Sequence, residues 1–216
     1  MVTPTASHPT TPPFLQVAEN LFQRRFPESD LPLVVSQLPI LGQALFAELV
    51  QQAETAVLSQ PAYAYNLMLV VDAAAQRSSD PFLRALAAWQ LGRIANGWVQ
   101  PRLAETAVSR ARTLFTQLQE PGWLAACTWQ LNALPWTRPN FTQATAELEL
   151  ALAGLLAAGF DDFAPWCHLS LAYAYLLTGH FDDCERETAV AQQNFQQTSN
   201  QLGLAHCHYN RASALR

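Results

Sequence analysis

The sequence repeats itself at an interval of about 40 residues, and this internal period constrains the fold more than any other feature. The segment Trp89-Gln90-Leu91 recurs as Trp129-Gln130-Leu131, and cysteine occupies one column three times, at Cys127, Cys167 and Cys207. Further columns hold identical residues at the same interval: Pro81 and Pro121, Ala104 and Ala144, Ala111, Ala151 and Ala191, Phe141 and Phe181, and His168 and His208. A fixed period of this length is typical of stacked structural units, so the sequence predicts a repeat architecture.

Each unit is predicted to contain two helices. In residues 161–198, Asp161 and Asp162 offer an N-terminal cap, Gly179 offers a helix end, and a second helix begins at Phe181. Apolar residues recur at helical spacing in both segments: Leu169, Leu171, Ala172, Tyr175 and Leu176 in the first, and Cys184, Thr188, Ala191 and Phe195 in the second. Ala, Leu and Gln dominate the chain while Gly occurs only 8 times, a composition that favours helix. We therefore expect an all-α fold of helical hairpins.

One part of this unit resembles the tetratricopeptide repeat (TPR) family. The segment 171–184 reads LAYAYLLTGHFDDC and Ala191 follows it, and weaker forms of the pattern recur at Leu91-Gly92 and at Phe141. A unit longer than the common length of about 34 residues is similar to the TPR variant of large signalling ATPases and of proteins with CHAT caspase-like peptidase domains. The resemblance implies a TPR-like α-solenoid, a right-handed stack of antiparallel helical hairpins with about five units.

The chain divides into three predicted regions. Residues 1–13 are rich in Pro and Thr and are expected to be a disordered tail, and 14–80 is expected to be a diverged or capping unit with helices at 39–59 and 61–77. Residues 81–216 hold the TPR-like repeats, in which Pro135 and Pro139 should shorten the helix that begins near Trp123. Because 200–216 reads as a first helix without a second, we expect an incomplete last unit and a longer parent protein.

Charge and composition exclude several classes of function. The formal net charge is -5, which leaves no basic surface for a nucleic acid. All 12 positive residues are Arg, so a P-loop lysine, a kinase lysine and a Schiff-base lysine are impossible. No segment reads as a membrane span or a secretory signal, so no membrane partner is expected and the cytoplasm is the expected location.

The Cys and His residues invite a catalytic or metal-binding interpretation, but the repeat favours a structural one. Equivalent cysteines on successive units should be separated by a helix-packing distance of about 8–10 Å, too far for a disulfide. A metal site at His168, His206 and His208 lacks a closely spaced anchoring pair. The acidic pairs at 161–162 and 182–183 fit helix starts. We predict no catalytic, cofactor or metal site, and expect any catalytic domain to lie beyond Arg216.

The resemblance instead places function on the concave face lined by the first helix of each unit. Carrying over the ligand-facing columns of the family gives the predicted partner-binding residues: Trp89, Arg93, Asn96, Trp129, Trp136, Trp166, Tyr173, His206 and Tyr209. Aromatic and Arg side chains are common anchors in protein interfaces. The alternative for each Trp and Tyr is that it packs between helices.

Three functional hypotheses follow. The first is a non-enzymatic scaffold that binds a segment or helix of a protein partner, as the sensor or regulatory arm of a larger effector. The second is a regulatory fragment of a CHAT-type peptidase or signalling ATPase whose catalytic domain lies outside this chain. The third is self-association through the exposed end of the incomplete stack.

Overall fold

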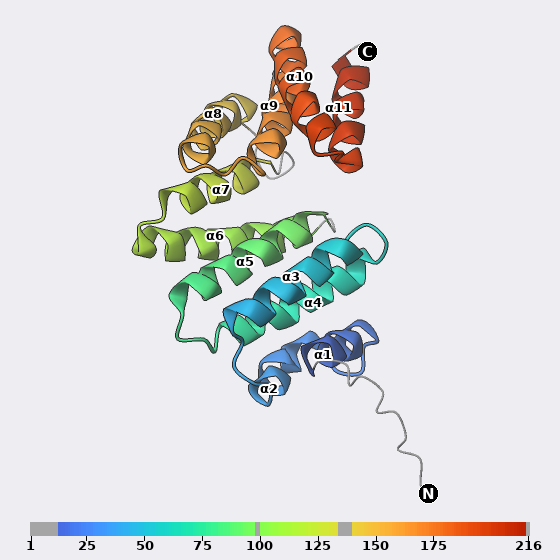
Figure 1. The fold of residues 1–216 in the computed structure, drawn as a ribbon, viewed down its shortest axis with the longest axis vertical. Helices are drawn as coiled ribbons and strands as arrows, with labels where there is room; N and C mark the ends of the chain where they lie inside the picture. The colour runs from blue at the N-terminus through green and yellow to red at the C-terminus, as the bar shows by residue number, and fades with distance from the viewer. Residues whose placement is uncertain (1–12, 98–99, 134–139, 215–216) are drawn as a thin grey trace, which may run out of the picture. The chain divides into compact units, whose positions relative to one another are not determined.

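The computed structural model describes residues 13–97, 100–133 and 140–214 of the 216-residue chain. Within these ranges the fold is all-α, with eleven α-helices, one short 3-10 helix and no strand (Figure 1). This confirms the predicted all-α helical-repeat fold. The helices form two compact units, one within residues 1–107 and the other within 108–216, and the division falls inside helix α6 (Pro101–Leu118). No helix among the described residues is long and apolar enough to cross a membrane.

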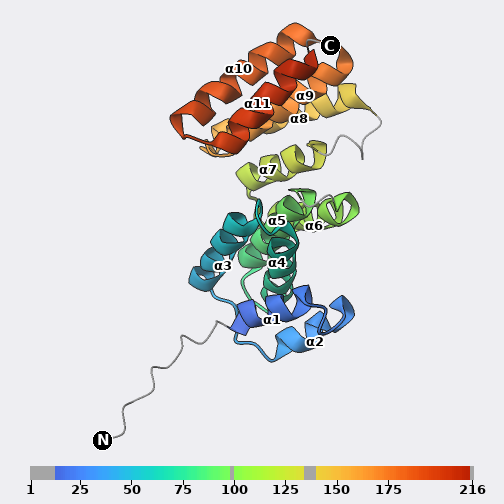
Figure 2. The ribbon, with the colours of Figure 1, turned by 90° about the vertical axis from the view of Figure 1, so that its right-hand side faces the viewer.

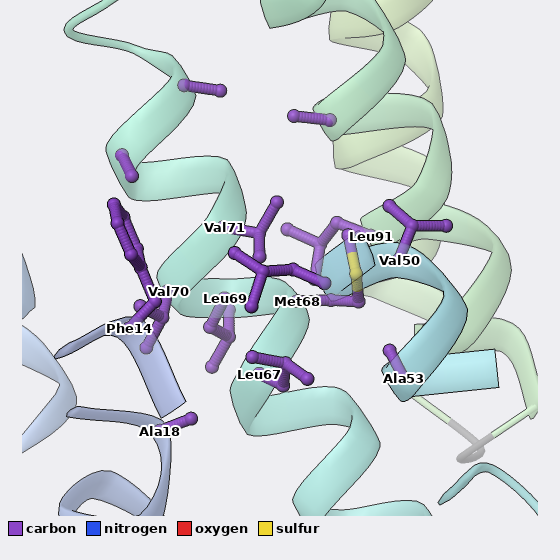
Figure 3. Packing of buried hydrophobic residues seen from close by; sticks show 14 of the residues in the cluster. Phe14, Ala18, Val50, Ala53, Leu67, Met68, Leu69, Val70, Val71 and Leu91 are labelled. Carbon is purple, nitrogen blue, oxygen red and sulfur yellow. The ribbon is translucent and has the colours of Figure 1, made fainter. Parts of the chain in front are cut away.

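The first unit is built around helix α4 (Pro61–Ala75), which contacts four other helices. These are α1 (Pro13–Phe22), α2 (Leu31–Ser36), α3 (Gln43–Ala56) and α5 (Pro81–Gly97); the 3-10 helix η1 (Glu28–Asp30) precedes α2. Residues on every side of α4 are buried, including the consecutive run 67–71, and Figure 3 shows this run between Phe14 and Ala18 of α1 and Val50 and Ala53 of α3. A helix that is apolar on all sides is typical of the centre of a helical core. Helices α3 and α4 lie within the ranges 39–59 and 61–77, which confirms that both predicted helices are present.

Two polar side chains fix the ends of helices in this unit. Arg77 donates from Nη1 to the carbonyl oxygens of Val35 (2.6 Å) and Leu38 (2.8 Å), which lie in the last turn of α2 and just after its end. Asp80 accepts from the backbone N–H groups of Phe82 (2.9 Å) and Leu83 (3.3 Å) and so caps the start of α5. The short α2 and the long α5 are thus both tied to the loop that follows α4.

The second unit contains the rest of α6 followed by five helices (Figures 1 and 2). They are α7 (Pro121–Asn132), α8 (Phe141–Ala157), α9 (Ala164–Thr178), α10 (Phe181–Gln197) and α11 (Gln201–Ala214). From α7 onward each helix contacts the next one, and α9 also contacts both α7 and α11. Helices α7, α9 and α11 therefore form one row, and α8 and α10 pack against that row as the second helices of successive hairpins.

The structure confirms the 40-residue period. Helices α4, α5, α6, α7 and α8 begin at 61, 81, 101, 121 and 141, and α10 and α11 begin at 181 and 201, so a hairpin occupies 40 residues. The three column cysteines are each 0% exposed, and Ala111, Ala151 and Ala191 are at most 1% exposed. Burial also adds Cys184 to the column of Ala104 and Ala144, and it reveals two columns that amino-acid identity concealed: Val108, Leu148 and Thr188, and Phe115, Leu155 and Phe195.

The backbone repeats at the same interval. Gln119, Gly159 and Ser199 have φ angles of 57°, 71° and 53°. Gln119 directly follows α6, and Gly159 and Ser199 lie two residues after the ends of α8 and α10. The residue that follows each of them donates its backbone N–H to a carbonyl oxygen five residues earlier, that of Phe115 (3.1 Å), Leu155 (2.9 Å) or Phe195 (2.9 Å). This is the Schellman end of a helix. Three different residues thus adopt the same backbone geometry at equivalent positions of this chain.

Local predictions had mixed outcomes. Gly179 ends α9 with a φ of 79°, as predicted, and Asp182 and Asp183 lie in the first turn of α10. The predicted cap at Asp161 and Asp162 is wrong, because α9 begins only at Ala164 and its N-cap residue Phe163 makes no capping side-chain bond. Pro165 in the first turn accounts for the shift, since proline fits the first positions of a helix. Helix α7 ends at Asn132, before Pro135 and Pro139, which lie outside the described residues.

Candidate functional site

The predicted partner-binding residues of the first unit lie on α5 and make contacts within that unit. Trp89 is fully buried, and the guanidinium carbon of Arg93 lies 5.8 Å from the centre of its ring. The same guanidinium forms an ion pair with Glu54 on α3, and Asn96 is partly buried. Trp89 therefore follows the alternative in which a tryptophan packs between helices.

Trp129 is also a packing residue. Its side chain is 8% exposed, and its indole Nε1 donates to Ser170 Oγ on α9 at 3.0 Å. Its ring stacks on Phe163, with ring centres 6.0 Å apart. These contacts fix α7 against α9. Trp136, the other tryptophan predicted for this hairpin, lies outside the described residues.

Helix α9 presents a partly exposed face that contains two of the predicted residues. Trp166, Ser170, Tyr173 and Leu177 are spaced by three or four residues, so they follow one side of the helix, and none of them is fully buried. We call these four residues the α9 stripe. Ser170 receives the bond from Trp129 of α7, and Trp166 contacts Phe195 of α10 edge-to-face at 4.8 Å. The stripe is therefore held by its neighbours while part of its surface stays open to solvent.

The last two predicted residues lie on α11 and are exposed. The ring centre of His206 lies 6.0 Å from that of Trp166, and Tyr209 is 60% exposed. Partial burial lowers the pKa of His206 below its ordinary value, so the imidazole is neutral at pH 7 and contacts Trp166 as an uncharged ring. The structure thus brings Trp166 and His206 together and places Tyr173 further along the same face of α9.

An ionisable pair links α9 to α10, and the sequence did not reveal it. His168 Nδ1 lies 2.7 Å from Glu187 Oε2, and both side chains are largely buried. The hydrogen bond with His168 is the main cause of a lowered pKa at Glu187, although burial acts in the opposite direction. The 19-residue separation of the two residues gives no local signal, and the sequence singled out His168 as the repeat equivalent of His208 and as a candidate metal ligand, not as a partner of Glu187.

All four cysteines are free and buried. Burial raises the pKa of the Cys127 and Cys167 thiols to about 12 and also raises the pKa values of the Cys184 and Cys207 thiols. A thiol with so high a pKa is a poor nucleophile at neutral pH. Among the described residues, no group of three His, Cys, Asp or Glu side chains is arranged to hold a metal ion.

A small hollow of about 270 Å³ lies between α8 and the turn that joins α9 to α10. Tyr175 donates to Glu149 Oε1 at 2.5 Å in its wall, and the His180 ring packs edge-to-face on the Tyr175 ring at 6.1 Å. Burial and this hydrogen bond raise the pKa of Tyr175 to about 12, so the phenol stays protonated at neutral pH. The remaining lining residues are Thr142, Thr145, Ala146 and Thr178. The polar side chains that line the hollow can form hydrogen bonds, and the protonated Tyr175 phenol does not act as a base at neutral pH.

Comparison of the sequence with models of protein families and with curated proteins gave no match in either case.

Proposed function

We propose that this chain is a protein-interaction domain of the TPR type, which binds a segment or helix of a partner protein through the α9 stripe. The observation that carries the proposal is that Trp166 and Tyr173 are partly exposed to solvent on a helix that its neighbours hold in place. Both aromatic side chains are partly open to solvent, while α9 is fixed on both sides by α7 and α11. Large, rigid aromatic side chains lose little conformational entropy on binding and often supply most of an interface's binding energy.

The neighbouring residues favour a peptide or helix as the ligand. The α9 stripe combines apolar surface at Leu177 (41% exposed) with a hydroxyl at Tyr173. Such mixed apolar and hydrogen-bonding surfaces suit an amphipathic protein segment. The stripe itself holds no charged residue, and the chain carries a net charge of -5, which disfavours nucleic acid.

In this proposal the domain serves as the sensor or regulatory arm of a larger effector, works in the cytoplasm and performs no chemistry itself. The buried, weakly acidic cysteines support a binding role over a nucleophilic one. If the effector is a CHAT-type peptidase or a signalling ATPase, its catalytic residues belong to another domain.

Photo-crosslinking in cells that produce the protein tests this function. A photoreactive phenylalanine analogue at Tyr173 should join the chain to one predominant protein, because Tyr173 is expected to face the partner. The same analogue at Thr113, an exposed residue of α6, is the control and should not capture that protein. Equal capture from both positions, or none from Tyr173, would contradict the proposal.

A further inference from the structure

The hollow between α8 and the turn that joins α9 to α10 has a wall made almost entirely of polar side chains. Hydroxyl, carboxylate and imidazole groups line it, from Thr142, Thr145, Glu149, Tyr175, Thr178 and His180. Its volume of about 270 Å³ is just below the range of about 300–1,000 Å³ that is typical of pockets for drug-sized ligands. The hollow can therefore hold one small polar group.

Two hydroxyl groups in this wall have no proton to donate to a ligand. Thr145 Oγ1 donates to the carbonyl oxygen of Phe141 at 2.9 Å. Thr178 Oγ1 donates to the carbonyl oxygens of Ala174 (3.0 Å) and Tyr175 (3.1 Å). Because a hydroxyl has a single proton, the oxygen of each threonine remains only as an acceptor.

The other polar groups are arranged in the same way. Tyr175 donates its proton to Glu149 Oε1 at 2.5 Å, which leaves lone pairs on the phenol oxygen and on the carboxylate. His180 Nδ1 lies 3.0 Å from Thr178 Oγ1, whose proton is already committed, so Nδ1 is the donor and Nε2 of the neutral ring is an acceptor. Apart from the Thr142 hydroxyl, which can act either way, the side chains of the wall therefore offer acceptors.

The hollow also carries negative charge. Glu149 is exposed, and no ion pair involves its carboxylate within the part of the chain that the structure describes. Beyond burial and the hydrogen bond to this carboxylate, the charges of Asp183 and Glu187 also raise the pKa of Tyr175, so their negative potential reaches the wall. Arg186 offsets part of that potential through its ion pairs with Asp183 and Glu187. The charge of Glu149 has no such partner.

We infer that the hollow binds a guanidinium group, carried either by a small guanidinium compound or by an arginine side chain of a peptide. A guanidinium presents only N–H donors, in one plane, and stays positively charged at any physiological pH. It therefore matches a wall of acceptors around the Glu149 carboxylate, with which it forms a bidentate pair. Its flat face also suits the aromatic rings of Tyr175 and His180.

Other classes of ligand fit this wall less well. An ammonium group presents its donors from one point, whereas the acceptors of the hollow lie on α8, on α9 and in the turn after α9. A Ca²⁺ ion takes about six to eight oxygen ligands, and Glu149 supplies the only carboxylate among the described lining residues. An anion would face that carboxylate, with no described Arg in the wall to attract it.

The hollow lies on a different side of α9 from the α9 stripe. Tyr175 is two positions after Tyr173, and two residues turn an α-helix by about 200°, so the two side chains point in roughly opposite directions. The guanidinium site and the proposed function therefore depend on different surfaces and can fail independently.

NMR titration of the full, isotopically labelled chain tests the inference, with N-acetyl-arginine amide as the probe. The backbone amide signals of Glu149, Thr178 and His180 should shift with a Kd of about 0.1–3 mM, as expected for a ligand of so few atoms. N-acetyl-citrulline amide has nearly the same shape without the charge, and it should bind at least about fivefold more weakly because it loses the charge-assisted hydrogen bonds. N-acetyl-lysine amide should also bind more weakly than the arginine probe.

A variant of the chain tests the role of the carboxylate. Glu149→Gln keeps the size of the side chain and removes its charge, so it should weaken binding of the arginine probe at least about threefold. The matched control is Glu185→Gln, which removes the same charge from an exposed glutamate of α10 outside the hollow and should bind as the wild type does. Because Glu149 is exposed, its variant should fold, and its amide spectrum checks this directly.

A library of blocked tetrapeptides with arginine at a fixed second position distinguishes the two sources of the guanidinium. A member that binds at least about tenfold more tightly than the arginine probe supports a peptide as the source, since it makes further contacts. Affinities that all equal that of the probe support a free guanidinium compound.

Three results would overturn the inference. The first is that the arginine probe shifts no signal of the hollow at concentrations up to about 10 mM. The second is that the citrulline probe, or the Glu149→Gln variant, gives the affinity of the arginine probe with the wild type. The third is that Tyr173→Ala abolishes binding of the arginine probe, since the α9 stripe and not the hollow would then be its site.

Discussion

His168 on α9 and Glu187 on α10 are joined by a 2.7 Å contact between Nδ1 and Oε2, and the pair is largely shielded from water. Glu187 lies 40 residues after Glu147, which accepts a hydrogen bond from Asn132 on α7. A glutamate at this position therefore connects the two helices of a hairpin in two successive units. Its partner differs between units, so the relationship is visible in the structure and not in a comparison of the sequences alone.

Glu187→Gln should lower the free energy of unfolding by about 1.5–3 kcal/mol at pH 7, the usual value of a hydrogen bond to a charged group. The pKa of Glu187 is lowered in the folded protein from its ordinary value of 4.5, so its contribution is complete above that pH and is lost as the pH falls through the lower, folded value. Urea unfolding at pH 7 and near pH 3 should therefore show a smaller difference between variant and wild type in acid. Glu185→Gln, at an exposed ion pair with Arg211, is the control and should cost less than about 0.5–1 kcal/mol. A pH-independent difference for Glu187→Gln would contradict this account.

The cysteines should resist thiol reagents in the folded protein. Burial raises the pKa of Cys127 and Cys167 from 9.0 to about 12, which lowers their thiolate fraction by about a thousandfold. A chromogenic disulfide reagent at pH 8 should react slowly with the native chain and rapidly with all four thiols in denaturant. Rapid reaction of one native thiol would show that its column is not packed as described.

Gly203→Ala should destabilise the second unit by about 1–3 kcal/mol, the usual cost of overpacking. A Cβ at this position would overlap the Phe195 ring, which is 2% exposed and cannot withdraw to solvent. Gly97→Ala is the matched control, because nothing lies within 4 Å of its added Cβ. Thermal unfolding should show a lower midpoint for Gly203→Ala only. Equal midpoints would indicate that α10 and α11 are less closely packed than described.

Trp89→Ala should lower the stability of the first unit by about 3–5 kcal/mol, the usual cost of removing a buried aromatic side chain. Tyr173→Ala should cost about 1 kcal/mol, because Tyr173 is only partly buried. Denaturant unfolding of both variants distinguishes the two roles. A Trp89→Ala variant as stable as the wild type would mean that Trp89 does not hold α5 in the core.

The repeat made it possible to predict the helical hairpins, one buried column and one helix end from the sequence. The Cys127, Cys167 and Cys207 column identified one buried position in three helices, and Gly179 marked a helix end correctly. The helix start at Asp161 was misplaced because a local cap signal competed with Pro165. Residues 199 and 119 gave no sign of positive φ, since Ser and Gln seldom adopt it and the geometry is imposed by the helix that ends there.

The candidate site was less predictable than the fold. A tryptophan at helical spacing has the same sequence signature whether it is buried, as Trp89 is, or partly exposed, as Trp166 is. Which of the two occurs depends on the neighbouring helices, and no sequence column encodes this. The contact between Trp166 and His206 joins residues 40 apart, so it too required the stacked arrangement of α9 and α11.

The affinity of the crosslinked partner for the Tyr173→Ala variant tests the central claim most directly. With purified components and isothermal titration, we predict a loss of at least about tenfold relative to the wild type, as expected for an aromatic anchor in an interface. Thr113→Ala should bind as the wild type does, and circular dichroism should show that both variants are folded. An affinity for Tyr173→Ala within about twofold of the wild type would contradict the claim that the α9 stripe is the binding surface.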